Sequence, residues 1–164
     1  MNLHEYQAKE IFERYGLPVS KRSLIKSESE IDDAINQIDF SNGCVAKVQA
    51  HTGGRGKVGG VKLCKNKADI EAFVNQWLGN IIITIQTDEL GLTVQTISLV
   101  ELTDIEKVLY MSFVVDRDEK CVSMIVSEAG GMNIEEVAEK TPEKILKGKL
   151  NHKYIIEDQD IIKL

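Results

Sequence analysis

The chain has 164 residues, a formal net charge of −6 and 43% hydrophobic residues. This length suffices for one core or for two small lobes, and the composition is ordinary for a globular protein and does not indicate disorder. The acidic balance argues against a general nucleic-acid binder, which normally carries a basic face. No apolar stretch reaches the roughly 18–20 residues of a membrane-spanning helix, so no membrane partner is expected.

The start of the chain predicts neither export nor import into an organelle. No basic region followed by an apolar one is present, and no transit peptide rich in Arg and Ser is seen. Cytoplasm is therefore the expected location. Three scattered cysteines, Cys44, Cys64 and Cys121, are typical of free thiols rather than of a disulfide framework. The three histidines are too dispersed to indicate a zinc cluster.

The first predicted elements are two helices. Residues 4–15 place apolar side chains at helical spacing, and Gly16 stands where a helix is commonly followed by glycine. Ser27 and Glu30 have the form of a capping box before a second helix at about 31–38.

The middle of the chain alternates strand and helix patterns. Residues 44–48 are rich in strand-forming types, and 58–64 form the next predicted strand. An apolar stripe over 67–78 predicts a helix. Residues 81–86 and 95–101 are two further predicted strands, joined by a loop.

The last third begins with a hairpin pattern. Residues 107–115 and 121–126 are predicted strands on either side of a charged turn. Asn133 is suited to cap a helix that Thr141-Pro142 stops, and a short helical segment through Leu150 is expected to follow. Several hairpins with few crossover helices predict an α+β fold with mixed or antiparallel sheets.

The most informative stretch is a glycine-rich turn, with five glycines among residues 53–60. Glycine lets the backbone come close to a ligand and adopt positive φ, so that consecutive N–H groups can point at phosphate oxygens. Arg55 and Lys57 add positive charge at the same place. The turn therefore predicts a phosphate-binding flap, and a mobile, solvated hairpin turn is the alternative.

Three other phosphate-binding motifs do not account for this turn. Residues 54–59 fit GxGxxG, but the dinucleotide motif needs a helix after the turn and a strand is predicted there. Residues 54–61 also fit the kinase pattern GxGxxGxV, yet neither HRD nor DFG occurs in the chain. A Walker A motif is excluded because no GK[ST] occurs.

Lys47 completes a different arrangement. It lies between apolar neighbours on the predicted strand before the turn. Taken alone, such a residue is more often an exposed strand lysine. Followed by a glycine-rich flap, it is a hypothesis for a phosphate ligand, because its side chain can reach the phosphates while its strand stays packed.

Several segments resemble, in the same order, the β subunits of the succinyl-CoA synthetase family. They are MNLHEYQAK (1–9), YGLP (15–18), GGRGK (53–57), GGV (59–61), VDR (115–117), IEEVAE (134–139) and TP (141–142). The resemblance covers the chain up to about residue 145. It implies the N-terminal portion of an ATP-grasp fold, with a small flap lobe at 20–110. Residues 1–19 and 111–164 would form an incomplete part of the larger lobe.

The resemblance also implies an activity. This family forms succinyl-CoA reversibly from succinate and CoA with ATP or GTP, which becomes ADP or GDP and phosphate, in the tricarboxylic acid cycle. A partner α subunit carries a phosphohistidine and binds CoA. The implied location is the bacterial cytoplasm.

Site residues follow from the same resemblance. Lys47 would contact the nucleotide phosphates. Gly54, Arg55 and Gly56 would form the flap. Glu101 matches a hinge glutamate beside the base, and Thr103 lies just beyond it. These six are the implied nucleotide-binding residues.

One position near this hinge departs from the family. Val108 stands where the family has a glutamate near the nucleotide sugar, and Glu106 is the possible substitute. ATP and GTP therefore both stay open as the nucleotide.

The resemblance implies that the chain is an N-terminal piece, since the family's β subunit is more than twice as long. Its Mg²⁺ ligands, an Asn and an Asp, lie beyond residue 164, as does the domain that faces the α subunit. No catalytic residue or metal ligand is assigned within this chain, and we expect weak nucleotide binding and no turnover of the isolated chain.

A malate–CoA ligase β subunit and a non-catalytic binding or interaction module are the alternatives. Exposed apolar surface would favour self-association.

Overall fold

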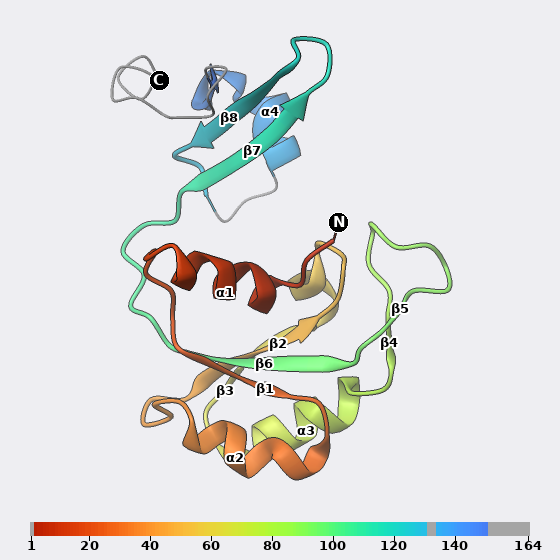
Figure 1. Ribbon diagram of the computed structural model, residues 1–164. Coiled ribbons are helices and arrows are strands. Elements are labelled where there is room, and N and C mark those ends of the chain that lie inside the picture. The colour runs from red at the N-terminus through yellow and green to blue at the C-terminus, as the bar shows by residue number, and fades with distance from the viewer. Residues whose placement is uncertain (1, 131–133, 151–164) are drawn as a thin grey trace. The chain divides into compact units, whose positions relative to one another are not determined.

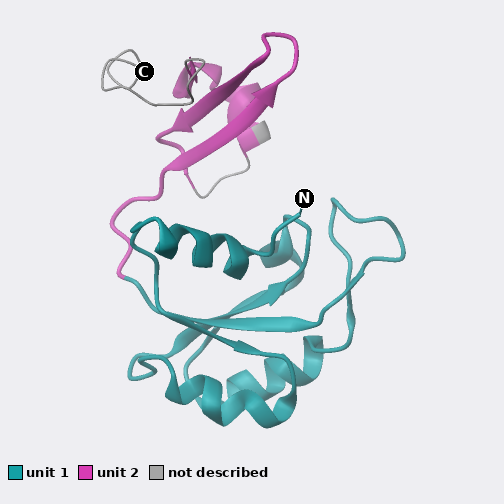
Figure 2. Ribbon diagram, viewed as in Figure 1, with its two compact units in different colours: residues 1–103 teal, residues 104–164 magenta. Residues whose placement is uncertain are grey.

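A computed structural model of the chain describes residues 2–130 and 134–150. The chain divides into two compact units, Met1–Thr103 and Asp104–Leu164 (Figure 2). Among the described residues, no helix has the length and apolar character to cross a bilayer.

The first unit is built on a four-stranded antiparallel sheet (Figure 1). In the order in which they lie side by side, its strands are β1 (Arg22–Ile25), β6 (Thr96–Glu101), β2 (Cys44–Gln49) and β3 (Val61–Cys64). Helices α2 (Ile31–Asn36) and α3 (Lys67–Trp77) lie against one face, and α1 (Glu5–Arg14) lies over the other (Figure 1). The sheet therefore has one apolar and one more polar face.

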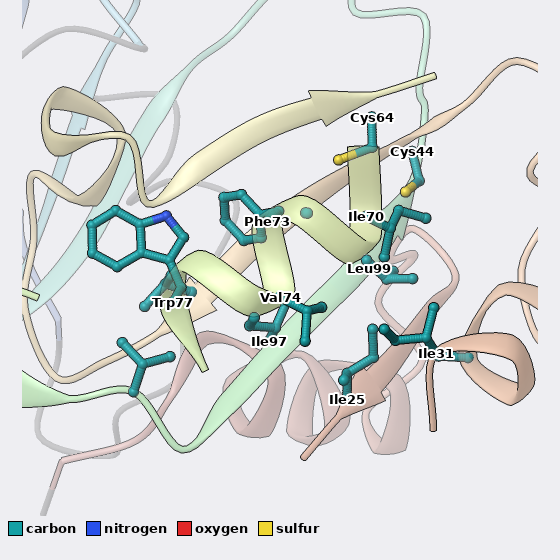
Figure 3. Close-up of a cluster of buried hydrophobic side chains, with 14 of the residues drawn as sticks. Ile25, Ile31, Cys44, Cys64, Ile70, Phe73, Val74, Trp77, Ile97 and Leu99 are labelled. Atoms are coloured by element: carbon teal, nitrogen blue, oxygen red, sulfur yellow. The ribbon is translucent and has the colours of Figure 1, made fainter. Parts of the chain in front are cut away.

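The core of this unit lies between the sheet and α3. Alternate residues of β2 and β6 point to the same face, which explains why Ala46, Ile97 and Leu99 are all fully buried. Phe73 of α3 belongs to the same core cluster, and its side chain is only 1% exposed. In Figure 3 the labelled side chains form one cluster, with Cys44 and Cys64 at one end and Trp77 at the other.

The cysteines are free thiols, as predicted. Cys44 and Cys64 are nevertheless neighbours, because they are directly opposite each other in the β2–β3 ladder. Both are fully buried in the core. Their sequence separation gave no sign of this pairing.

Two of the helices end or begin as local chemistry requires. After α1, the Gly16 N–H donates to the Glu13 carbonyl and the Leu17 N–H to the Phe12 carbonyl, with Gly16 at φ +75°. This is a Schellman ending, which confirms the prediction for this glycine. At α3, the Asn66 side chain accepts a 2.9 Å hydrogen bond from the Asp69 N–H, a cap that the sequence analysis missed.

The predicted capping box at Ser27 and Glu30 is wrong. Ser27 precedes a short 3₁₀ turn, η1 (Glu28–Glu30), and makes no side-chain cap. Its hydroxyl bonds to Ser29 instead. Glu30 accepts from the Lys26 N–H, one residue earlier than a capping box requires. Helix α2 still forms, because Ile31 and Ala34 are buried against the sheet.

Two predicted strands are shorter than expected. Of residues 81–86, only β4 (Ile81–Ile82) is a strand, and it pairs with β5 (Leu92–Thr93). Thr84 turns the chain away, since its carbonyl accepts from the Thr87 N–H and hydroxyl. The strand predicted at 58–64 begins at Val61, because the 3₁₀ turn η2 (Arg55–Val58) includes Val58 and the next residue, Gly59, is left-handed with φ +83°.

The second unit is a three-stranded antiparallel sheet in the order β7 (Tyr110–Asp116), β8 (Cys121–Ser127) and β9 (Ile145–Lys149). Helix α4 (Ile134–Lys140) and the 3₁₀ turn η3 (Pro142–Lys144) precede β9.

The predicted hairpin and the helix that stops at Thr141-Pro142 are confirmed. The helical segment predicted through Leu150 is wrong. There Ile145 pairs with Ser127 and Lys149 with Ser123, so β9 completes the sheet. The predicted Asn133 cap lies outside the described residues. The α+β class with antiparallel sheets is confirmed.

Replacing Phe73 by Ala should lower the free energy of unfolding by about 3–5 kcal/mol, because it leaves a cavity in the core. Urea denaturation followed by circular dichroism measures the change. The matched control is Phe12→Ala in α1, where the ring is 48% exposed and the effect should be small. Equal losses for the two variants would contradict the assignment of this core.

Candidate functional site

The alternation along β2 places Lys47 on the face of the sheet opposite the core. Its neighbours Ala46 and Val48 are fully buried, whereas the Lys47 side chain is 25% exposed. In the β2–β6 ladder Lys47 lies opposite Ser98. The strand therefore holds the backbone of Lys47 firmly while its amino group is directed away from the apolar core.

The amino group of Lys47 meets a carboxylate from α1. Its Nζ donates to Glu5 Oε1 at 3.1 Å. Arg55 Nη2 donates to Glu5 Oε2 at 2.8 Å, and Lys9 Nζ lies 3.0 Å from Oε1. We call Glu5, Lys9, Lys47 and Arg55 the Glu5 cluster. Three cations from a helix, a strand and a turn thus share one carboxylate.

The cluster changes the acidity of Glu5. Burial opposes ionisation, but the charge of Lys47 and the hydrogen bonds from Lys9 and Arg55 outweigh it. Together they lower the pKa of Glu5 to about 2. Glu5 is therefore fully ionised near neutral pH and pairs with the cations around it.

The glycine-rich turn is closed by its own backbone. Gly54 and Gly59 flank η2 with φ of +71° and +83°, values that favour glycine. The Gly60 N–H donates to the Arg55 carbonyl at 2.8 Å, and the Gly60 carbonyl accepts from Val48 at 2.9 Å. A Cβ on Gly60 would lie 2.9 Å from Ile82 Cδ1. The turn thus packs closely against Ile82 at Gly60, and it connects β2 to β3.

The first residues of this turn have backbone N–H groups that are not used within the turn. Among the described residues, the backbone N–H groups of Gly54, Arg55 and Gly56 donate to no backbone carbonyl in this turn, whereas that of Lys57 donates to Gly54. The side chain of Arg55 is bound internally, because its Nη1 donates to the Val48 carbonyl and its Nη2 to Glu5. The turn therefore offers peptide N–H groups next to a bound guanidinium.

Glu101 and Thr103 lie at the far end of β6. Glu101 pairs with Cys44 and its Oε1 accepts from the Asp39 N–H at 2.6 Å. The Thr103 hydroxyl is 3.0 Å from that of Ser20. Glu101 lies three positions after Ser98, the partner of Lys47, which corresponds to about 10 Å along the strand. Lys47 and the glycine-rich turn therefore lie together, whereas Glu101 and Thr103 lie at the other end of β6.

Val108 and Glu106 belong to the second unit. Val108 is 45% exposed, and its carbonyl accepts from the Gly130 N–H at 3.2 Å. A Cβ on Gly130 would lie 2.3 Å from that carbonyl oxygen, so this contact requires glycine.

Sequence reasoning missed Glu5 and two histidines. Glu5 is 42 residues from Lys47 and 50 from Arg55, so no spacing rule connects them. The rings of His4 and His51 stack with their centres 3.9 Å apart. Burial, followed by the charges of His51 and Arg55, lowers the pKa of His4. Both rings line a hollow of about 570 Å³ beside the start of α1. Within residues 2–130 and 134–150, no three His, Cys, Asp or Glu side chains gather as metal ligands.

The comparison with protein families gives the class of the protein. Residues 2–164 match the model of the ATP-grasp domain. The chain belongs to the ATP-grasp family.

Within that class, the chain is similar to particular enzymes. It is 50% identical over 147 residues to the succinate–CoA ligase [ADP-forming] subunit beta of Pseudomonas aeruginosa, covering 90% of this chain and 38% of that protein. It is 52% identical over 142 residues to the subunit of the same name from Pasteurella multocida, covering 87% and 36%. The chain thus spans less than two fifths of the length of these curated relatives.

Solved structures agree on the fold. One is ACD1 of Ca. Korarchaeum cryptofilum in complex with coenzyme A, with a TM-score of 0.67 and 19% identity over 99% of this chain and 64% of that one. Another is ATP citrate lyase from Methanothrix soehngenii in complex with citrate and coenzyme A, with a TM-score of 0.67 and 16% identity over 99% and 37%. At these identities the likeness concerns the fold alone.

The Glu5 cluster should make stability depend on pH. Because the folded state lowers the pKa of Glu5 from 4.5 to about 2, its contribution is complete above pH 4.5 and is lost as the pH falls towards 2. We expect Glu5→Gln to lower the free energy of unfolding by about 1–3 kcal/mol at pH 7, and by progressively less below pH 4.5. Urea denaturation at pH 7, 4.5 and 3 measures this difference.

Glu10→Gln is the control, since Glu10 is an exposed residue of the same helix. It should behave as the wild type at each pH. A loss for Glu5→Gln that is the same at pH 7 and pH 3 would contradict the shifted pKa.

Proposed function

We propose that this chain is the nucleotide-binding part of a succinate–CoA ligase β subunit. In this proposal Lys47 and the N–H groups of Gly54, Arg55 and Gly56 hold the phosphates. Glu101 and Thr103 hold the base end of the nucleotide. Residues 20–110 form the small lobe, and 1–19 and 111–164 belong to the larger one.

One observation carries the phosphate assignment: an anion already lies at this place. The carboxylate of Glu5 is held by Lys47 at 3.1 Å and by Arg55 at 2.8 Å, directly beside the glycine-rich turn. Phosphate oxygens have the same requirement for charged donors, and peptide N–H groups of a glycine turn add to them. The strand lysine and the turn thus form a place suited to a phosphate.

The end of β6 supports the base assignment. Glu101 lies about 10 Å along the strand from Ser98, the residue opposite Lys47, so the two assigned ends of the site are separate. Glu101 ends a strand whose preceding residues Leu99 and Val100 are buried. A base site needs an apolar wall and a few directed polar groups, and this strand end can provide both.

For the whole protein, we propose the reaction named by the relatives, in which succinate and CoA are joined with ATP and yield ADP. ATP is favoured over GTP because those relatives are ADP-forming. The partner would be an α subunit with a phosphohistidine and a CoA site, in the bacterial cytoplasm. Mg²⁺ would neutralise charge on the phosphates. No observation favours a malate–CoA ligase or a non-catalytic module.

Isothermal titration with Mg-ATP tests nucleotide binding. We expect binding that Lys47→Ala weakens about tenfold or more, which corresponds to about 1.4 kcal/mol, because the charged donor to the phosphates is removed. The matched control is Lys62→Ala on β3, whose side chain is 45% exposed and whose loss should leave the affinity unchanged. Undetectable binding to the wild type, or equal effects of both substitutions, would refute the assignment.

The 164-residue chain by itself should not turn over. When it is mixed with the α subunit of a related ligase, no succinate-dependent consumption of CoA is expected, since phosphoryl transfer depends on metal ions that bridge the phosphates. A coupled assay for free thiol measures CoA consumption. Steady consumption above the rate of the α subunit alone would contradict this prediction.

A further inference from the structure

We propose that Glu5 is the internal counter-ion of the phosphate site, and that a nucleotide phosphate binds by taking Lys47 from it. This inference rests on the proposed function, because it describes how the same site exchanges its anion. Glu5 is then a positioning residue that holds the cations in place while the site has no nucleotide.

The contacts show a carboxylate placed as a phosphate would be. Oε1 accepts from Lys47 at 3.1 Å, and Oε2 accepts from Arg55 at 2.8 Å. Two oxygens of one anion therefore bind a strand lysine and a turn arginine separately. Two oxygens of a phosphate group can be held by the same pair of donors.

The charges of the cluster favour exchange for a larger anion. Lys9, Lys47 and Arg55 contribute three positive charges, and Glu5 contributes one negative charge. The excess of two positive charges attracts a multiply charged anion, such as the phosphates of a nucleoside triphosphate. A single carboxylate cannot neutralise it.

Burial makes replacement more favourable than simple loss of the contact. The side chains of Glu5, Lys47 and Arg55 are 26%, 25% and 18% exposed. A partly buried charge that loses its partner is left unpaired at considerable cost. An incoming phosphate avoids this cost for Lys47, because it provides a new partner as the carboxylate leaves.

The two cations differ in how firmly they are held elsewhere. Arg55 also donates through Nη1 to the Val48 carbonyl, so its guanidinium stays anchored to β2 when Glu5 moves. For Lys47, among the described residues, the ion pair recorded is the one with Glu5. Lys47 is therefore the group that changes partner, and Arg55 keeps the turn in place during the exchange.

Helix α1 can shift and move Glu5 away from Lys47, because no residue of the helix is buried. Its start is tied to β2 through polar contacts, among them the Tyr6 N–H with Gln49 Oε1 at 3.3 Å. A helix end held by polar contacts rather than by apolar burial opens at low free energy. The carboxylate can thus withdraw without disturbing the core.

The test is the affinity of Glu5→Gln for Mg-ATP and for inorganic tripolyphosphate, measured by isothermal titration. Removing the competing negative charge should tighten the binding of both probes about five- to tenfold. Glu10→Gln is the matched control and should bind as the wild type. In a Lys47→Ala background, Glu5→Gln should have less than about a twofold effect, because the charge that changes partner is missing.

The outcomes separate this inference from the proposed function. If the wild type binds Mg-ATP and Glu5→Gln binds it equally or more weakly, the counter-ion role is overturned while the nucleotide site stands. If neither protein binds either probe, the nucleotide site itself is refuted. Glu5→Asp covers the case in which Glu5→Gln does not fold, as judged by circular dichroism. Its shorter carboxylate cannot reach both cations, so binding tighter than wild type is expected, and unchanged or weaker binding overturns the role.

Discussion

The alternation of side chains along β2 is the constraint on which the rest of the first unit depends. This strand pairs with β6 on one side and with β3 on the other, so its register fixes both neighbours. Its core-facing residues Ala46 and Val48 are fully buried. A shift by one residue would exchange the two faces and bury Lys47 in the apolar core, which is very unfavourable for an ammonium group. Core packing therefore also fixes the position of Lys47, the lysine that we propose as a phosphate ligand.

The glycine-rich turn is held by hydrogen bonds to Val48, near the end of the same strand. Val48 serves the turn twice, since its N–H donates to the Gly60 carbonyl and its carbonyl accepts from Arg55. Any side chain on Gly60 would meet Ile82 and the backbone of Arg55. The glycines thus have different reasons to be present. Gly54 and Gly59 provide backbone conformations with positive φ, whereas Gly60 allows close packing.

The sequence predicted the first unit well where one local signal governs the structure. The apolar stripe of α3, the strand at Cys44 and the ending of α1 at Gly16 were all recognised from neighbouring residues. It failed where tertiary pairing decides. Residues 145–149 form β9 because β8 offers a free edge, and no local pattern reports this.

The same division holds for the site. Lys47 and Arg55 of the glycine-rich turn are close in sequence, and both bind the carboxylate of Glu5. Glu5 reaches them from a helix more than forty residues away, as its separation of 42 from Lys47 shows. The chemistry of Glu5 is not unusual for a residue in the first turn of a helix, where acidic side chains are common. Only the packing of α1 over the sheet (Figure 1) brings it to Lys47 and Arg55.

The net charge of −6 and the proposed phosphate site are compatible because they act over different distances. At physiological ionic strength, interactions between exposed charges fade over about 8 Å, so the acidic surface has little effect inside the Glu5 cluster. There the distances are about 3 Å and the groups are partly removed from water, which strengthens each interaction. Without Glu5, the three cations would lose the carboxylate that they share and would repel one another, which would destabilise the fold. The carboxylate of Glu5 relieves this repulsion, and in our proposal a nucleotide phosphate takes over this role when it replaces Glu5 at Lys47.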